Sequence, residues 1–271
     1  MTGHADNDHA NNDHANNDND PVTPAATGHL YGVGIGPGDP ELMTIKARRV
    51  LQSCPVVAHF AARNRHGNAW SIIEGVVTDA QVVLRLEYPV TTEAVEPGDY
   101  ERQIAAFYDH SATHIATHLD EGRDVAVVCE GDPFFYGSYM YIHQRLADRY
   151  PTTVIPGVTS FSAATAAAGV PLVSMNETLT ILPGVMPPQQ LKEALANVDA
   201  AVVMKVGRHL GDVLDAARSV GLAEQGIYVE RASCPTELVL PLVDTTEIDA
   251  PYFSLVLLPG TGLASRRQTL T

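Results

Sequence analysis

The chain has 271 residues, of which 45% are hydrophobic, and a formal net charge of −15 at pH 7. This length predicts two domains of ordinary size, each large enough to bury a core. The acidic charge repels phosphate backbones, which argues against nucleic acid as a partner. No apolar run approaches the roughly 20 residues that span a bilayer, and no basic start precedes an apolar stretch. We therefore expect a cytoplasmic protein that binds no membrane.

Metal and disulfide chemistry find little support in the sequence. The three cysteines, Cys54, Cys129 and Cys234, are far apart and form no C-x-x-C pair. Residues 4–18 repeat a five-residue unit as HADND, HANND and HANND. A segment so polar cannot bury enough apolar surface to fold, so we expect residues 1–29 to be a disordered tail. Its histidines would hold a metal only loosely, and we predict no metal site.

From residue 30 onward, short apolar strands alternate with helical patterns, which predicts an α/β fold with an open, mostly parallel sheet. A strand at 30–35 ends abruptly in a glycine-rich first corner, residues 34–39. A helix at 41–52 follows at once, with Asp39 or Pro40 in its first turn. The other strands are expected at 56–60, 81–86, 125–129 and 154–155, and the other helices at 68–77, 100–121, 139–149 and 161–168.

Two more glycine corners follow strands of the same predicted sheet. The second corner, residues 130–137 (EGDPFFYG), carries two carboxylates and three aromatic rings, and the third corner is residues 156–160 (PGVTS). Parallel sheets bind ligands at the carboxyl ends of their strands, so we expect the three corners to meet at one rim. Glycine also lets a ligand approach the backbone N–H groups closely.

The character of the chain changes around Pro171, where a second α/β domain begins. Strands are expected at 178–182, 200–206, 227–230 and 252–258, and helices at 189–197 and 210–220. A fourth corner, residues 230–234 (ERASC), follows one of these strands and could line a cleft between the domains. We divide the chain into the tail (1–29), an N-terminal domain (30–170) and a C-terminal domain (171–271).

The first corner does not fit the dinucleotide-binding pattern G-x-G-x-x-G. Counted from Gly32 the sixth position is Pro37, and counted from Gly34 it is Asp39, so the third glycine is missing. Pro37 also lacks the N–H that a pyrophosphate would use. A nicotinamide-dependent oxidoreductase on the same kind of sheet is therefore the weaker interpretation.

Six segments, taken in order, resemble the tetrapyrrole methylase family, whose members transfer methyl groups from S-adenosylmethionine. They are GVGIGPGDPELMTIKA (32–47), EGDPFFYGS (130–138), IPGVTSFSAA (155–164), VMKVGR (203–208), VERA (229–232) and PYFSLVLL (251–258). The resemblance covers nearly all of the chain after the tail. It implies two α/β domains with the cofactor in a cleft between them, and commonly a homodimer.

Within the family, the likeness implies methylation of C20 of precorrin-2, giving precorrin-3A in cobalamin biosynthesis. The same reaction on the cobalt-containing substrate is the nearest alternative, and a non-catalytic tetrapyrrole carrier is a further one. The resemblance also implies the residues that hold S-adenosylmethionine. They are Gly36, Pro37, Gly38, Gly131, Asp132, Pro133, Tyr136, Thr159, Ser160, Val206 and Ala232. Because this cofactor has no phosphate, the missing third glycine is no obstacle.

Methyl transfer from a sulfonium is an in-line displacement, so catalysis depends mainly on positioning, worth ~7–11 kcal/mol in well-oriented systems. A base could then take the hydrogen from C20, and the candidates are Tyr136, Glu130 and Glu177, with solvent as the alternative. Capping of backbone N–H groups is the competing interpretation of both glutamates. The substrate class carries many carboxylates, so we expect arginines near strand ends to bind it. They are Arg63, Arg65, Arg85, Arg208 and Arg231.

Overall fold

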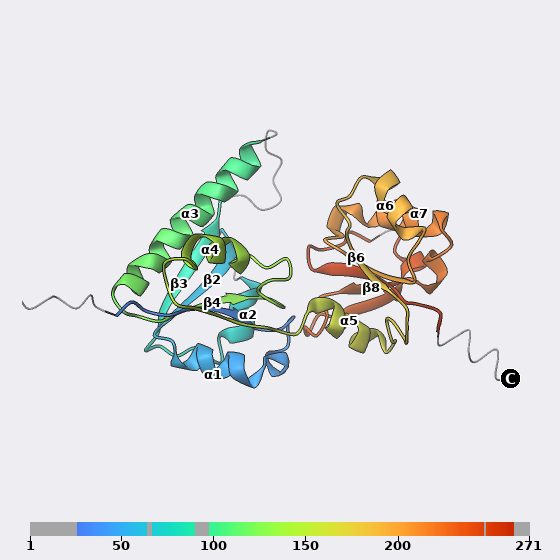
Figure 1. Cartoon of the computed structure of the whole chain (residues 1–271). Helices are drawn as coiled ribbons and strands as arrows, with labels where there is room; N and C mark the ends of the chain where they lie inside the picture. The colour runs from blue at the N-terminus through green and yellow to red at the C-terminus, as the bar shows by residue number, and fades with distance from the viewer. Residues whose placement is uncertain (1–25, 64–66, 90–97, 247, 263–271) are drawn as a thin grey trace, which may run out of the picture.

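The computed structural model of the chain describes residues 26–63, 67–89, 98–246 and 248–262, which form two lobes lying side by side (Figure 1). Most of the predicted tail, residues 1–25, falls outside the described residues. Residues 26–29 lie against the first lobe, where the Gly28 N–H donates to the Leu119 carbonyl at 2.7 Å. The His29 N–H donates to the Asp124 carboxylate at 2.8 Å.

A five-stranded parallel sheet forms the centre of the first lobe, in the order β3-β2-β4-β1-β5. All five residues of β4 are buried, as expected of a central parallel strand with helices on both faces. The strands are β1 (Leu30–Gly34), β2 (Val56–Ala62), β3 (Val82–Tyr88), β4 (Val125–Cys129) and β5 (Thr152–Ile155). The predicted open parallel sheet is confirmed.

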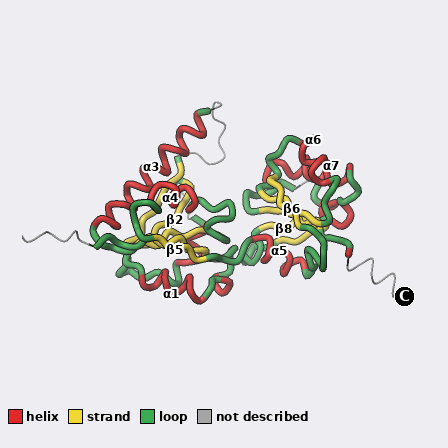
Figure 2. The backbone as a smooth tube through the Cα atoms, viewed as in Figure 1, coloured by secondary structure: helices red, strands yellow, loops and turns green. Residues whose placement is uncertain are grey.

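Helices cover both faces of this sheet (Figure 2). On one face α3 (Asp99–Asp120) and α4 (Tyr139–Leu146) share a core with β2 and β4. On the other face lie α1 (Ile45–Ser53) and α2 (Asn68–Ile73). Alternate residues of β4 enter the two cores, because successive side chains of a strand point to opposite faces.

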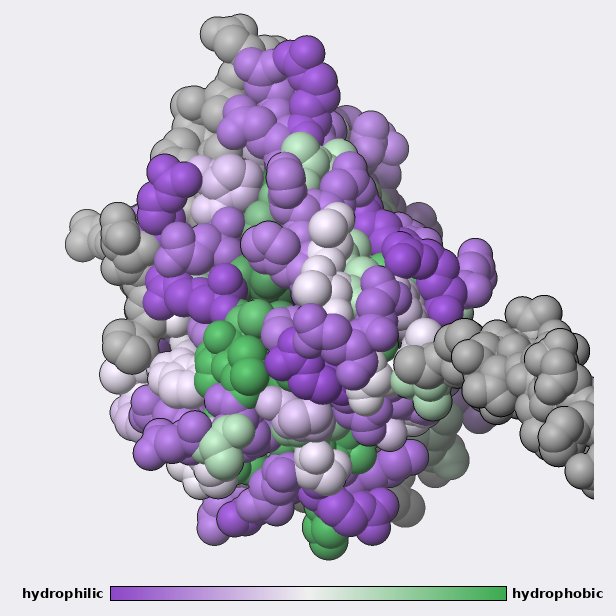
Figure 3. Space-filling view, turned by 90° about the vertical axis from the view of Figure 1, so that its left-hand side faces the viewer, coloured by the Kyte–Doolittle hydropathy of each residue, from purple (hydrophilic) through white to green (hydrophobic). Residues whose placement is uncertain are grey.

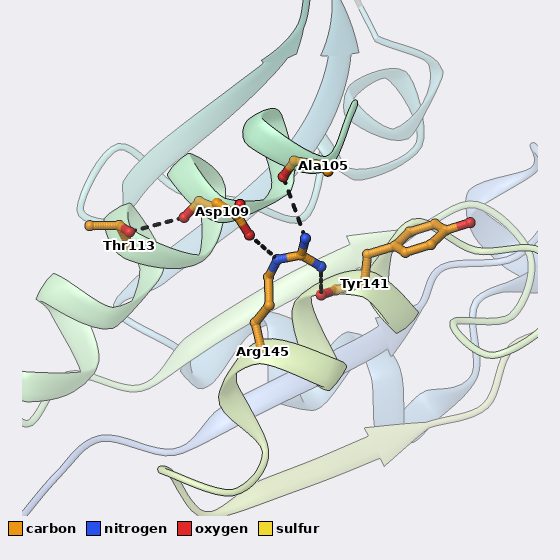
Figure 4. A network of polar contacts seen from close by, with 5 residues as sticks. All are labelled: Ala105, Asp109, Thr113, Tyr141 and Arg145. Atoms are coloured by element: carbon orange, nitrogen blue, oxygen red, sulfur yellow. Dashed lines mark hydrogen bonds and ion pairs between the residues drawn. The ribbon is translucent and has the colours of Figure 1, made fainter. Parts of the chain in front are cut away.

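Arg145 links α4 to α3 (Figure 4). Its Nε donates to the Asp109 carboxylate at 2.7 Å, and its other nitrogens donate to the carbonyls of Tyr141 at 2.9 Å and Ala105 at 3.4 Å. Asp109 is mostly exposed, and such surface ion pairs contribute roughly 0–1 kcal/mol. The apolar contacts between the helices and the sheet therefore provide most of the packing energy.

The predicted helix at 41–52 is divided in the structure. Asp39 opens a short 3₁₀ turn, η1 (Pro40–Leu42), by accepting the Glu41 N–H at 2.8 Å. Met43 is then extended, and Thr44 begins α1 by accepting the Ala47 N–H at 3.1 Å. The prediction of one continuous helix is wrong, because threonine is a strong N-cap and the extended Met43 can bury its side chain in the core.

The second lobe contains a mixed sheet in the order β6-β7-β10-β8-β9. β6 and β7 are parallel, whereas β10 is antiparallel to both β7 and β8, and β9 is antiparallel to β8. Consequently β6, β7 and β8 run in the same direction and end at the same edge. The strands are β6 (Leu179–Pro183), β7 (Ala200–Met204), β8 (Ile227–Glu230), β9 (Leu238–Pro241) and β10 (Ser254–Leu258).

One face of the second sheet packs against α6 (Pro188–Leu195) and α7 (Leu210–Ser219). The short 3₁₀ turns η2 (Gly207–His209), η3 (Ala223–Gln225) and η4 (Leu242–Asp244) complete this lobe. The edge strand β9 was not predicted, because four residues that end in a proline give almost no periodic signal.

Helix α5 (Ser160–Ala168) covers the other face of the second sheet. Its Ala163 and Ala164 share a core with Val202 and Leu257, and the helix lies beneath the second lobe in Figure 1. The predicted division after residue 170 lies between β5 and β6, and α5 precedes it. By packing, the second lobe begins with α5.

The outer face of the first lobe, turned away from the second, is mostly hydrophilic with a small apolar area (Figure 3). None of the helices in the described residues is long and apolar enough to cross a bilayer.

Candidate functional site

The first three corners touch through their backbones. The Gly131 N–H donates to the Gly36 carbonyl at 2.7 Å, and these two residues form an isolated antiparallel bridge. A Cβ built on Gly34 would lie 2.5 Å from the Gly157 nitrogen, and one on Gly157 would lie 2.0 Å from the Gly131 carbonyl oxygen. Backbones this close leave no room for a side chain. The expected meeting of the three corners at one rim is confirmed.

Asp132 fixes the second corner to the third. Its Oδ2 accepts the Gly157 N–H at 3.1 Å, and its Oδ1 accepts the Phe134 N–H at 2.9 Å. A carboxylate that accepts two backbone N–H groups from different segments holds both in one geometry. Asp132 therefore shapes the rim directly.

The fourth corner meets the first corner from the second lobe. The Asp39 N–H donates to Ser233 Oγ at 3.1 Å. A Cβ built on Gly38 would lie 2.4 Å from Cys234 Sγ and 3.2 Å from the Ala232 carbonyl oxygen. The carboxyl ends of β1 and β8 thus face each other across the two lobes.

A second contact between the lobes joins the end of β7 to the second corner. The Lys205 ammonium nitrogen lies 4.8 Å from the centre of the Tyr136 ring, a cation–π geometry. Phe135 packs edge-on against Tyr136 and against Phe161 of α5. We call the place where the four corners and Lys205 meet the junction.

Backbone strain is concentrated at the junction. Five described residues other than glycine have positive φ, and four of them lie here: Tyr136 (56°), Lys205 (58°), Arg231 (44°) and Ser233 (64°). The left-handed conformation costs an L-residue roughly 1–2 kcal/mol. Such strain persists only where the surrounding structure enforces it, and it clusters at functional sites.

Main-chain groups and a hydroxyl surround Gly131. A Cβ built on Gly131 would make ordinary van der Waals contacts, the nearest at 3.8 Å, with backbone atoms of Val158, Thr159 and Ser160. The Thr159 hydroxyl pairs with Ser162 Oγ at 2.9 Å without capping α5. Hydroxyls and main-chain groups suit the ribose and amino-acid parts of S-adenosylmethionine.

The structure brings together the residues expected to hold the cofactor. Gly36, Pro37 and Gly38 are on the first corner. Gly131, Asp132, Pro133 and Tyr136 are on the second corner, and Thr159 and Ser160 on the third. Ala232 is on the fourth corner, and Val206 is buried directly after Lys205.

The three candidate bases have different surroundings. Tyr136 lies at the junction with 45% of its surface exposed. Glu130 accepts the Ala69 N–H at 3.0 Å at the start of α2, and burial raises the pKa of its carboxyl.

Glu177 lies away from the junction. It accepts N–H groups from Gly262 at 2.6 Å and Ser174 at 2.7 Å, and these hydrogen bonds lower the pKa of its carboxyl. Because β10 is antiparallel to β7, the segment that follows β10 lies beside the start of β7. Glu177 therefore lies at the opposite end of the second sheet from Lys205, and its placement does not support the predicted role as a base.

The predicted substrate arginines fall into two groups. Arg208 and Arg231 are at the second-lobe edge of the junction, where Arg231 pairs with Glu230 at 3.1 Å. Arg63 directly follows β2, and Arg65 lies outside the described residues. Arg85 is the central residue of β3, so the expectation that it lies at a strand end is wrong, because β3 continues to Tyr88. Arg85 pairs with Glu87 at 2.7 Å.

Beside this second group, a hollow of about 230 Å³ is lined by His59, Gly67, Trp70, Val83 and Arg85. The described residues contain no group of three histidine, cysteine or acidic side chains placed to bind a metal ion.

Lys205 was not predicted as a site residue. Only arginines were expected as partners for the substrate carboxylates, although a lysine directly after the apolar strand AAVVM is placed in the same way.

A family model for Tetrapyrrole (Corrin/Porphyrin) Methylases matches residues 29–246. The chain belongs to the tetrapyrrole methylase family. It is 48% identical to the precorrin-2 C(20)-methyltransferase of Sinorhizobium sp, over 86% of this chain and 96% of that relative. It is 26% identical to the cobalt-precorrin-2 C(20)-methyltransferase of Salmonella typhimurium, over 85% of this chain and 95% of that relative.

Another relative is larger than this chain. The cobalamin biosynthesis protein CobIJ of Mycobacterium tuberculosis is 48% identical over 91% of this chain but only 48% of its own length. The chain thus spans about half of that relative.

Solved structures of tetrapyrrole methylases share the fold. The cobalt precorrin-4 methyltransferase CbiF aligns with a TM-score of 0.61 at 24% identity, over 85% of this chain and 94% of that one. The methyltransferase CobJ aligns with a TM-score of 0.63 at 19% identity, over 86% of this chain and 95% of that one. The predicted fold class and family are confirmed.

The contact between the corners predicts the effect of a single methyl group. Gly157→Ala should destabilise the first lobe by about 1–3 kcal/mol, because the added carbon overlaps the Gly131 carbonyl. Urea unfolding followed by the fluorescence of Trp70, the single tryptophan, measures this loss. Gly75→Ala is the control, since its Cβ meets no atom within 4 Å and should change stability by no more than about 0.5 kcal/mol. Equal effects of the two substitutions would contradict the tight corner contact.

The raised pKa of Glu130 predicts a pH-dependent stability. The pKa of Glu130 in the folded protein lies above the ordinary 4.5. Protonated Glu130 therefore contributes its full share to the free energy of unfolding below pH 4.5, and this contribution is lost as the pH rises through the folded pKa. Glu130→Gln keeps an oxygen for the Ala69 N–H and cannot ionise. Urea unfolding between pH 4 and 8 should therefore show that this variant gains stability relative to wild type as the pH rises. Glu74→Gln, at an exposed position, is the control and should show no such change with pH. A stability gain of Glu130→Gln that shrinks as the pH rises would refute the raised pKa of Glu130.

Proposed function

We propose that the protein is an S-adenosylmethionine-dependent methyltransferase that methylates C20 of precorrin-2 to give precorrin-3A in cobalamin biosynthesis. The convergence of the four corners at the junction carries this proposal, because every cofactor residue expected from the sequence lies at or beside them. The precorrin-2 C(20)-methyltransferase of Sinorhizobium sp is 48% identical to this chain over 96% of its own length, which supports the choice of substrate.

The proposed cofactor site uses groups from both lobes. The main chain of Gly36–Gly38 and Gly131–Pro133 borders it in the first lobe, together with Thr159 and Ser160. Val206 and Ala232 close it from the second lobe. When bound, the cofactor supplies an electrophilic methyl group on a sulfonium. Asp132 holds the second and third corners in place around it through its two N–H contacts.

The rigid junction suits a reaction that depends on alignment. The corners are fixed by backbone contacts and strained dihedral angles, so little reorganisation is needed when ligands bind. With S-adenosylmethionine held by these corners, its methyl group would pass to the ring carbon, S-adenosylhomocysteine would leave, and the ring carbon would then have to give up a proton. Of the three candidate bases, Tyr136 is the one that lies exposed at the junction, and we propose that its phenolate or a solvent molecule takes this proton.

The identities favour the metal-free substrate over the cobalt-containing one, because the relative named for the former is 48% identical and the relative named for the latter 26%. Incubation of the purified protein with S-adenosylmethionine and each macrocycle tests this directly. We expect precorrin-2 to gain the mass of one methylene group. Turnover of the cobalt form alone would replace the substrate assignment, and turnover of neither would refute the proposed reaction.

We also propose that the protein works as a homodimer, as the family resemblance suggests, and that it does so in the cytoplasm, as the cysteine usage and the polar N-terminal segment suggest. Light scattering during gel filtration should give twice the mass of the chain, and the mass of a single chain would reject the dimer.

The role of Asp132 predicts weaker cofactor binding in a variant. Asp132→Ala should weaken the binding of S-adenosylhomocysteine about fivefold or more. This corresponds to a loss of ~1 kcal/mol of binding free energy, as expected when a hydrogen bond to a charged carboxylate is removed. Isothermal titration calorimetry measures the change. Asp215→Ala, an exposed residue of α7, is the control and should leave the affinity unchanged. An unaltered affinity in Asp132→Ala would remove this residue from the site.

A further inference from the structure

Lys205 reaches from the second lobe to the first. It directly follows β7, and its ammonium lies 4.8 Å from the centre of the Tyr136 ring. Lys205 is exposed, and 45% of Tyr136 is exposed as well. Solvent and a ligand can therefore both reach this pair.

The backbone around Lys205 is held in a strained conformation. Its φ is +58°, which an L-residue adopts only where the structure enforces it. The Gly184 N–H donates to the Met204 carbonyl at 2.6 Å, and a Cβ on Gly184 would lie only 3.2 Å from Val206 Cα. The end of β6 thus presses against this turn and fixes the direction in which the lysine leaves the strand.

The charge of Lys205 is not neutralised by the described part of the chain. No carboxylate among the described residues lies within ion-pair distance of its ammonium, whereas Arg85 pairs with Glu87 and Arg231 with Glu230. The Tyr136 ring attracts the cation without neutralising it, and an ammonium has three N–H donors. In a chain of net charge −15, an unneutralised cation at the junction is suited to an anionic ligand.

We propose that Lys205 binds a carboxylate of the tetrapyrrole substrate, with the Tyr136 ring fixing the ammonium in place. The inference rests on the proposed function, since that function brings a macrocycle with many carboxylates to the junction. Lys205 thereby determines how the ring is oriented relative to the methyl donor. Ammonium and carboxylate form charge-assisted hydrogen bonds, which are about twice as strong as neutral ones.

A purely structural role would give a different result. If Lys205 only linked the two lobes, its loss would lower stability and weaken the binding of S-adenosylhomocysteine and of substrate together. If Lys205 binds substrate, its loss weakens the binding of substrate alone. Lys205→Met separates these cases, because it keeps the length of the aliphatic side chain and removes the charge.

Kinetics of the full chain with precorrin-2 provide the first test. Lys205→Met should raise the KM for precorrin-2 about tenfold or more, as expected for the loss of a hydrogen bond between charged groups. The affinity for S-adenosylhomocysteine and the urea midpoint should stay at wild-type values, and Lys205→Arg should recover part of the KM. Lys192→Met, which removes an exposed lysine of α6, is the matched control with wild-type kinetics. An unchanged KM in Lys205→Met would overturn the inference, as would a parallel loss of S-adenosylhomocysteine binding.

Nuclear magnetic resonance provides a second readout that needs no turnover. The chain has three lysines, Lys46, Lys192 and Lys205, so reductive ¹³C-methylation gives a simple spectrum in which Lys205→Arg identifies one signal. With S-adenosylhomocysteine present to prevent methyl transfer, precorrin-2 should shift the Lys205 signal and leave the Lys192 signal in place. A Lys205 signal that does not move would overturn the inference.

The two proposals fail separately. If wild-type protein methylates precorrin-2 and Lys205→Met does so equally well, the role of Lys205 is refuted and the function stands. If wild-type protein binds S-adenosylhomocysteine but methylates neither macrocycle, the proposed function is refuted, and the role of Lys205 with it.

Discussion

The rest of the molecule depends on direct contact between the backbones of three strand ends. Gly34, Gly131 and Gly157 approach so closely that no side chain fits at the first or the third of these positions. This contact is possible because β1 lies between β4 and β5 in a parallel sheet, which carries three consecutive carboxyl ends to one point. The sheet order determines which corners meet, and the glycines determine how closely.

The second lobe contributes the remaining residues of the junction. Three of its strands end at one edge, and two of those ends reach the corners of the first lobe through Ser233 and Lys205. Both residues have positive φ, as do Tyr136 and Arg231 beside them. The strain is tolerated because hydrogen bonds and close packing from both lobes hold these turns, so the site has its shape before any ligand arrives.

Much of this arrangement could be predicted from the sequence, and the exceptions have physical causes. The apolar run of β4 and the glycine corners are local signals, and they indicated both the parallel sheet and its ligand-binding rim. The break at Met43 depends on a buried side chain, and the mixed direction of the second sheet depends on the pairing of β10, so neither is visible in a local pattern. The position of Lys205 over Tyr136 joins residues far apart in the chain, and only the packed lobes reveal it.

The packing of α5 has a consequence for dividing the protein. In the described part of the chain the polypeptide passes from one sheet to the other once, through residues 156–160, and α5 packs on the sheet that follows it. A fragment that stops before this crossing lacks Gly157 and Thr159, and one that stops after α5 exposes the apolar side of that helix to water. The two halves therefore cannot be cut apart into independent units without damage to one of them, because the third corner is both a part of the binding rim and the covalent connection between the sheets.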